Sequence, residues 1–197
     1  MKPLPIKLSE INAIQFGSFT LKSGLLSPFY VDLRLTISYP EIIKEIARLM
    51  HEEMRHLSFD LIAGVPYTAL PFATALSLMH TIPMVMNRKE VKDYGTKKKV
   101  EGVFKEGDTC LIIEDIITSG SSILDTASSL RSCGLIVTDA LVLINREQGG
   151  DQRLKENGIT LHSVYTMRSI IQTLLKENKM DTAHAEKALA FIEKVKT

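Results

Sequence analysis

The sequence predicts an α/β fold, with an open, mostly parallel and twisted sheet that is flanked by helices. Strand-like and helix-like segments alternate along the chain, which is the pattern of repeated β-α units in a parallel sheet. The strand-like segments are also almost continuously apolar, as residues 137–144 illustrate, and such runs are typical of strands covered on both faces. Ligands of such a sheet bind beyond the carboxyl ends of its strands.

The individual elements follow from local signals. Strands are predicted over residues 59–65, 82–86, 109–114, 137–144 and 159–165. Helices are predicted over residues 40–56, 68–80, 121–133, 167–177 and 181–195. Pro40 suits the first turn of its helix, Pro71 is expected to delay the start of its helix, and Gly134 stops the helix before it. Asp181 suits the N-cap region of the last helix.

The composition indicates a globular protein of ordinary charge. A chain of 197 residues suits one domain, and 24 basic against 23 acidic residues give a net charge of +1, so nothing overall indicates nucleic acid or an anionic membrane as a partner. No run approaches the roughly 18 apolar residues of a membrane span, and the first residues do not resemble a signal peptide. We expect a cytoplasmic protein with reduced Cys110 and Cys133.

The most informative segment covers residues 110–130, CLIIEDIITSGSSILDTASSL. It predicts a buried strand that ends in Glu114 and Asp115, then a loop of small residues that opens a helix. Unpaired backbone N–H groups at a helix N-terminus favour a phosphate, and Gly120 lets the backbone approach it closely. The two acids would repel a phosphate but suit the hydroxyls of an attached sugar. The residues therefore suggest a ribose 5-phosphate site, although many turns of this kind bind nothing.

A second polar segment, residues 88–107, holds six Lys and Arg residues before Glu101. It has three possible interpretations: a solvated surface loop, a basic arm for nucleic acid, or a lid that brings cations to a diphosphate. The second is weakened because the segment lacks interleaved aromatic residues and the chain is nearly neutral.

Six segments together resemble the orotate phosphoribosyltransferases, which are type I phosphoribosyltransferases, and most of all the corresponding domain of bifunctional UMP synthases. The motif strand and loop resemble the binding motif for phosphoribosyl diphosphate (PRPP). The other segments match in order and spacing: FTLKSGLLSPFYVDLR, GVPYTALP, RKEVKDYGTK, VTDALVLINREQGG and LHSVYT. The resemblance covers nearly the whole chain.

This resemblance implies a type I phosphoribosyltransferase fold in a single domain over residues 1–197, with an N-terminal hood (1–36), an α/β core (37–165) and C-terminal helices (166–197). It implies transfer of ribose 5-phosphate from PRPP to orotate, with Mg²⁺ bound through PRPP and water rather than directly by the protein. It also implies a homodimer in which the loop of each subunit serves its neighbour, with no nucleic-acid or membrane partner.

The resemblance also assigns roles to residues. Lys92, Glu114 and Asp115 would be catalytic. The residues expected to bind PRPP are Tyr67, Thr68, Arg88, Lys89, Lys92, Tyr94, Glu114, Asp115, Ile116, Ile117, Thr118, Ser119, Gly120, Ser121 and Ser122. Those expected to bind orotate are Lys22, Tyr30, Val31, Thr118 and Arg146, where Arg146 suits bidentate pairing with a carboxylate. An ion pair with Glu147 is the structural alternative for Arg146.

Three positions depart from the family pattern: Glu114 stands where many members have Asp, Tyr94 where bacterial members often have His, and Thr68 where many have Lys. Two other functions stay open. A phosphoribosyltransferase for another base would not need the cations at Lys22 and Arg146. A non-catalytic regulator on the same fold would need a DNA-binding segment, and none is visible.

Overall fold

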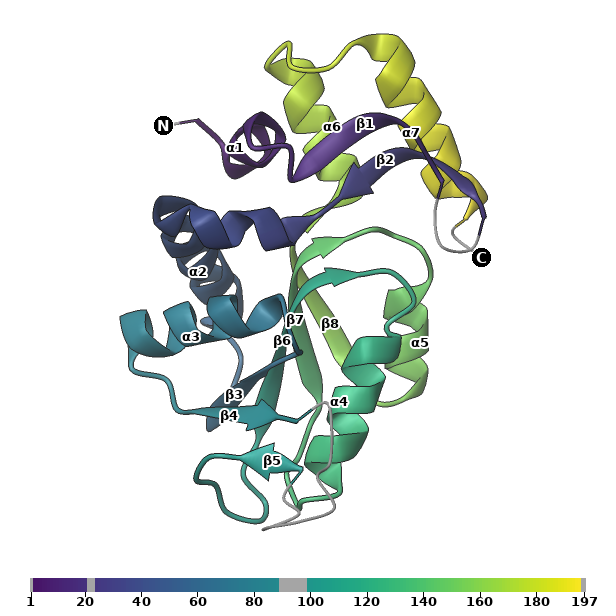
Figure 1. Cartoon of the computed structure of the whole chain (residues 1–197). Coiled ribbons are helices and arrows are strands. Elements are labelled where there is room, and N and C mark those ends of the chain that lie inside the picture. The colour runs from purple at the N-terminus through teal and green to yellow at the C-terminus, as the bar shows by residue number, and fades with distance from the viewer. Residues whose placement is uncertain (1, 21–23, 89–98, 196–197) are drawn as a thin grey trace.

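The computed structural model describes residues 2–20, 24–88 and 99–195 (Figure 1). The helices, including the 3₁₀ helix η1, are α1 Leu4–Glu10, η1 Leu33–Ser38, α2 Pro40–Met54, α3 Ala69–His80, α4 Ser121–Arg131, α5 Gly150–Glu156, α6 Met167–Lys176 and α7 Thr182–Lys194. The strands are β1 Ile14–Thr20, β2 Leu26–Val31, β3 Leu61–Gly64, β4 Met84–Asn87, β5 Val100–Glu101, β6 Cys110–Ile117, β7 Asp139–Asn145 and β8 Thr160–Thr166.

The central sheet confirms the predicted α/β class. Its six strands have the order β5-β4-β3-β6-β7-β8, and all of them are parallel except the short edge strand β5, which pairs antiparallel with β4. The chain adds strands outward from the central pair β3 and β6, with β4 and β5 on one side and β7 and β8 on the other. The loops after β3 and β6 therefore leave the middle of the sheet at the same edge, where a ligand crevice is expected.

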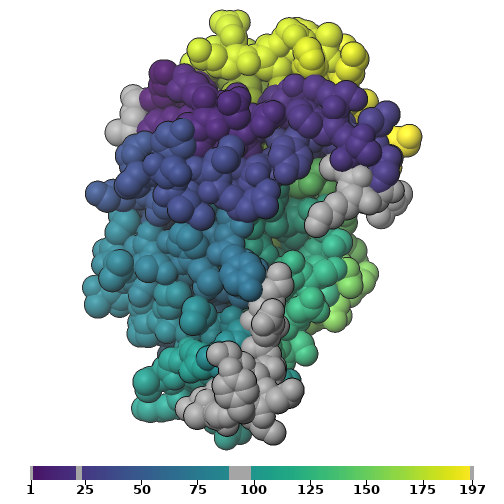
Figure 2. All heavy atoms as spheres, in the orientation of Figure 1, coloured from purple at the N-terminus to yellow at the C-terminus, as the bar shows by residue number. Residues whose placement is uncertain are grey.

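Two apolar clusters cover the faces of this sheet. One contains buried residues of α2 and α3 and continues into α1, the hairpin β1–β2, α6 and α7. The other contains buried residues of α4 and α5 on the opposite side. The N-terminal segment and the C-terminal helices lie together over one end of the molecule, as Figures 1 and 2 show. Helix α7 packs against β2, so both ends of the chain build this cap.

Most predicted boundaries agree with the structure to within two residues, but two predictions are wrong. The motif strand was expected over residues 109–114, but β6 continues to Ile117 because its ladder with β7 runs on to the pair Ile117–Asn145, beyond the last pair with β3 at Ile113. The acids therefore lie within the strand instead of ending it. Pro71 does not delay α3, which begins at Ala69, because a proline in the first turn of a helix lacks only an N–H group that would have no helical partner.

Several elements had no predicted counterpart: α1, the β1–β2 hairpin, η1, β5 and α5. The hairpin is irregular, with a register shift between Phe16 and Phe19, so its apolar residues do not alternate cleanly. No helix among the described residues is long and apolar enough to span a membrane.

Candidate active site

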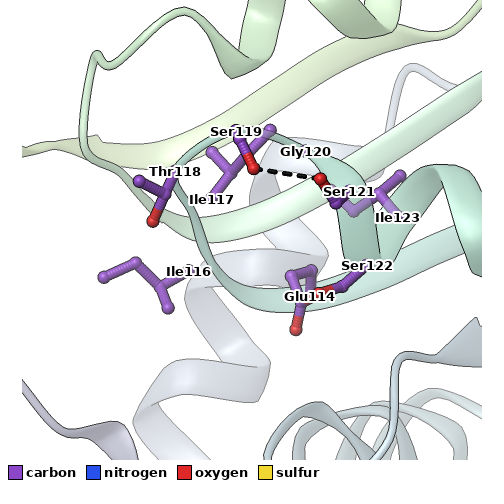
Figure 3. Close-up of a pocket in the computed structure, with 9 residues that line it drawn as sticks. All are labelled: Glu114, Ile116, Ile117, Thr118, Ser119, Gly120, Ser121, Ser122 and Ile123. Carbon is purple, nitrogen blue, oxygen red and sulfur yellow. Dashed lines mark hydrogen bonds between the residues drawn. The ribbon is translucent and has the colours of Figure 1, made fainter. Parts of the chain in front are cut away.

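A cavity of about 150 Å³ lies where β6 turns into α4 (Figure 3). Its lining brings together eight of the fifteen predicted PRPP-binding residues, Glu114, Ile116, Ile117, Thr118, Ser119, Gly120, Ser121 and Ser122, with Ile123, which was not predicted. No side chain of the described residues caps the N-terminus of α4, so the first N–H groups of that helix are available to an anion. The Ser119 and Ser121 hydroxyls lie 3.1 Å apart and form the hydrogen bond drawn in Figure 3. We call this loop, residues 118–122, the cradle.

Glycine at position 120 is required by the backbone. Gly120 has a φ of 76°, which side chains rarely tolerate, and a Cβ atom here would lie 3.3 Å from the Gly150 carbonyl oxygen. Gly150 has even less room, because a Cβ atom there would lie 2.5 Å from the Thr118 carbonyl oxygen. Helix α5 therefore packs directly against the cradle, and Gly120 is buried rather than exposed.

The two acids of β6 lie in different surroundings. Glu114 is 6% exposed and lines the cradle cavity. Burial raises the pKa of its carboxyl, and the neighbouring Asp115 raises it further. Burial also raises the pKa of Asp115, although hydrogen bonds oppose this shift. The charge of Asp32, just after β2, adds to the increase for Asp115.

A second cavity of about 370 Å³ lies beside the cradle and shares Ser122 with it. Its cations are Arg88, at the end of β4, and Lys99, before β5. The Arg88 Nε atom lies 3.1 Å from a Glu101 carboxylate oxygen. Val65 and Pro66, after β3, form another wall. Thr68 is half-buried and Tyr67 is 66% exposed, and the peptide bond between Pro66 and Tyr67 is cis.

Arg146 emerges at the end of β7, on the side of the site that faces the hairpin. Its guanidinium carbon lies 5.2 Å from the centre of the Phe29 ring in β2, a cation–π arrangement. Its Nε and Nη2 atoms are buried and have no hydrogen-bond partner among the described residues. Burial lowers the pKa of Arg146. A buried guanidinium with unused donors is a strong candidate for binding an anionic ligand.

The hairpin places Tyr30 differently from Phe29. Tyr30 is partly exposed and stacks on Phe19, with ring centroids 5.7 Å apart. Successive strand residues face opposite sides, so the inward contact with Arg146 comes from Phe29 and not from the predicted Tyr30. Val31 is half-buried and pairs with Ile14 across the hairpin.

Comparison with known proteins agrees with this geometry. Residues 37–181 match the family model for the phosphoribosyl transferase domain. Over 190 residues, the chain is 44% identical to the orotate phosphoribosyltransferase of Chlamydia caviae, and the match covers 95% of this chain and 92% of that protein. The chain belongs to the orotate phosphoribosyltransferase family. Its sheet and helices are the type I phosphoribosyltransferase fold.

Two further orotate phosphoribosyltransferase relatives are informative. The chain is 48% identical over 188 residues to the uridine 5′-monophosphate synthase of Bos taurus, but it spans only 39% of that protein while 94% of this chain is matched. A Mycobacterium tuberculosis orotate phosphoribosyltransferase, solved in complex with PRPP, superposes with a TM-score of 0.68 at 26% identity. That match covers 85% of this chain and 99% of the other.

Four of the residues predicted for an orotate phosphoribosyltransferase site lie outside the described residues: Lys22, Lys89, Lys92 and Tyr94. The structure also adds residues that were not predicted. Lys99 and Asp125 line the second cavity, and Phe29 contacts Arg146. A signal for Phe29 was present, because it precedes Tyr30 in the same segment and strand alternation directs one of the two inward. Asp125 offered no such signal, because helix position alone does not indicate which cavity it lines.

Proposed function

We propose that this chain transfers ribose 5-phosphate from PRPP to orotate, giving orotidine 5′-monophosphate and diphosphate in pyrimidine biosynthesis. The observation that carries the proposal is that the buried Nε and Nη2 atoms of Arg146, at the same sheet edge as the cradle, have no hydrogen-bond partner among the described residues. A phosphate site alone would suit many ligands. A buried cation nearby selects a base that carries a negative charge, and orotate carries a carboxylate.

The cradle would hold the 5-phosphate of PRPP. Backbone N–H groups at the start of α4 and the hydroxyls of Thr118, Ser119, Ser121 and Ser122 supply donors. Glu114 and Asp115 would hold the ribose hydroxyls. As the bond from ribose C1 to the diphosphate oxygen breaks and the bond to the base nitrogen forms, positive charge develops on the sugar, and the negative charge that this acid pair carries would stabilise it.

The second cavity would receive the diphosphate. Arg88 and Lys99 supply positive charge there, and Val65 and Pro66 of the loop after β3 line the same cavity. We propose that Tyr67 and Thr68, which follow in that loop, also contact the diphosphate. We propose Lys92 as the principal cation for the leaving group, with Lys89 and Tyr94 as further PRPP contacts. Mg²⁺, bound through PRPP oxygens and water, would supply additional charge neutralisation for the leaving diphosphate.

The base would lie between the hairpin and Arg146. Arg146 would pair with the orotate carboxylate, an interaction that would use the donors left without partners. Lys22, Tyr30, Val31 and Thr118 would complete the pocket. Glu147 does not form an ion pair with Arg146, because its carboxylate contacts Arg168 instead.

We also propose that the whole chain acts as one domain and as a homodimer. Large apolar side chains are exposed on η1 and near the end of α3, and α2 packs against both elements. They are Leu35, Ile37, Tyr39, Leu78 and Met79. Leu78 is 79% exposed, which is unusual for leucine unless a partner covers it.

The direct test is an assay of diphosphate release with PRPP and Mg²⁺. Orotate should support release, whereas uracil, adenine and hypoxanthine should not, because they lack a carboxylate for Arg146. Equal or greater turnover with a purine would show that orotate is not the preferred substrate. PRPP binding without turnover of any base would favour a non-catalytic regulator on this fold.

A further inference from the structure

The isolation of Arg146 needs an explanation, because a carboxylate stands next to it in the sequence. Buried cations normally pair with a neighbouring acid, since an uncompensated charge is costly away from water. Glu147 directly follows Arg146, yet the structure pairs Glu147 with a different cation.

Arg168, at the start of α6, holds the Glu147 carboxylate. The backbone N–H of Arg168 donates to Glu147 Oε2 at 3.0 Å, and the Arg168 Nε atom lies 3.6 Å from Oε1. The Arg168 guanidinium also pairs with Glu193 of α7, and this bond raises the pKa of Arg168. Glu147 thus faces a cation that is itself fixed between two acids.

The backbone of Glu147 is also constrained. The Asn145 side-chain oxygen accepts a hydrogen bond of 2.8 Å from the Glu147 N–H group. Glu147 has a φ of 58°, which is uncommon for a residue with a side chain. Helix α6 does not need Glu147 to begin, because Thr166 and Ser169 form a complete capping box of their own.

We propose that Arg168 is a positioning residue that holds the Glu147 carboxylate away from Arg146 and so keeps Arg146 free for the carboxylate of the base. This inference rests on the proposed function. If Arg168 lost its charge, Glu147 would keep only the bond from the Arg168 backbone N–H, and its unpaired carboxylate oxygen would compete with the substrate for the donors of Arg146.

The test compares orotate and PRPP kinetics in an Arg168→Met variant, which keeps the apolar stem but removes the charge. The KM for orotate should rise roughly fivefold, a change typical of a partly exposed charge pair, while kcat and the KM for PRPP stay close to wild type. Adding Glu147→Gln should restore the KM, because glutamine keeps the shape of glutamate but cannot compete as an anion. Arg48→Met, which breaks the Arg48–Glu52 pair on α2, is the matched control and should change nothing.

Two results would overturn the proposal. One is an unchanged KM for orotate in Arg168→Met. The other is a raised KM that Glu147→Gln fails to restore, since Arg168 would then act through the placement of α6 and not through the Glu147 charge. Failure of the proposed function is a separate result, because the unmodified protein would then show no turnover of orotate.

Discussion

Glu114 is buried at the site, and Arg146 is half-buried with two buried guanidinium nitrogens that have no hydrogen-bond partner among the described residues. Burial lowers the pKa of Arg146 and raises that of Glu114, so each environment disfavours the charged form. A fold gains no stability from such groups, and they are retained mainly where chemistry or binding needs them. Both residues were predicted from the sequence, because each stands at the end of a continuous apolar strand pattern.

Arg146→Ala should raise the KM for orotate about ten- to a hundredfold, because a charge-assisted pair contributes roughly 1.5–3 kcal/mol. PRPP binding should survive, since the cradle is built from other elements. Steady-state kinetics with each substrate varied in turn would measure both effects. If PRPP binding fell while orotate binding held, Arg146 would belong to a different pocket.

Glu114→Gln should stabilise the folded protein at alkaline pH while reducing activity. The pKa of Glu114 is raised above its ordinary value of 4.5, so above that pH the unfolded chain loses the proton first and the wild type loses stability as pH rises. Glutamine removes this loss. The variant should match the wild type near pH 4.5 and exceed it by about 1–3 kcal/mol at pH 8, the usual penalty for a buried, unsatisfied group.

Urea unfolding at both pH values would measure this difference in the free energy of unfolding. Glu186→Gln, at an exposed position on α7, is the control and should follow the wild type at both pH values. A Glu114→Gln variant that is no more stable than the wild type at pH 8 would contradict the inferred pKa shift.

The helices and strands differ in how far the sequence determines them. Helices α2 and α6 begin where predicted, at Pro40 and Met167, because each has a strong apolar face and a clear start signal. Asp181 caps α7 as expected, accepting a hydrogen bond of 2.8 Å from the His184 N–H group. The extension of β6 to Ile117 could not be predicted, because it depends on pairing with β7 and not on local sequence. Helix α5 has only 7 residues and two buried positions, too few for a periodic signal.

Gly150→Ala tests the contact between α5 and the cradle. The added methyl group would lie 2.5 Å from the Thr118 oxygen and 2.8 Å from Ile117, so the loop must shift. We expect a loss of about 1–3 kcal/mol in stability, as for other overpacked sites, together with weaker PRPP binding. Gly17→Ala is the control, because its methyl group would meet only the Phe19 ring at 3.4 Å. Wild-type stability and affinity in Gly150→Ala would mean that the cradle is not held rigidly by α5.

The oligomeric state is harder to predict from the sequence than the fold, because exposed apolar residues do not show which surface covers them. The proposed dimer shares Lys92 across its two-fold interface, and a two-fold interface forms two such composite sites at once. Only such a shared site allows two inactive variants to complement each other in a mixed dimer.

Mixing two inactive variants should restore activity. Lys92→Ala lacks the donated cation, whereas Asp115→Asn keeps it and damages its own ribose site. A mixed dimer would combine an intact Asp115 in one chain with Lys92 from the other. Activity should reach up to about a quarter of wild type if half the dimers are mixed and each has one good site. Inactive heterodimers of verified composition would place Lys92 in its own subunit's site.

The cap formed by both ends of the chain has a consequence for synthesis. Residues 110–131 supply the cradle from one contiguous stretch, so the ribosome releases them together. The proposed base side instead needs the hairpin, which precedes the cradle in the sequence, and α7, which follows it, and the two meet where Phe29 lies edge-on to Phe191 with ring centroids 5.8 Å apart. During synthesis the cradle segment therefore emerges before α7 can complete the proposed base pocket.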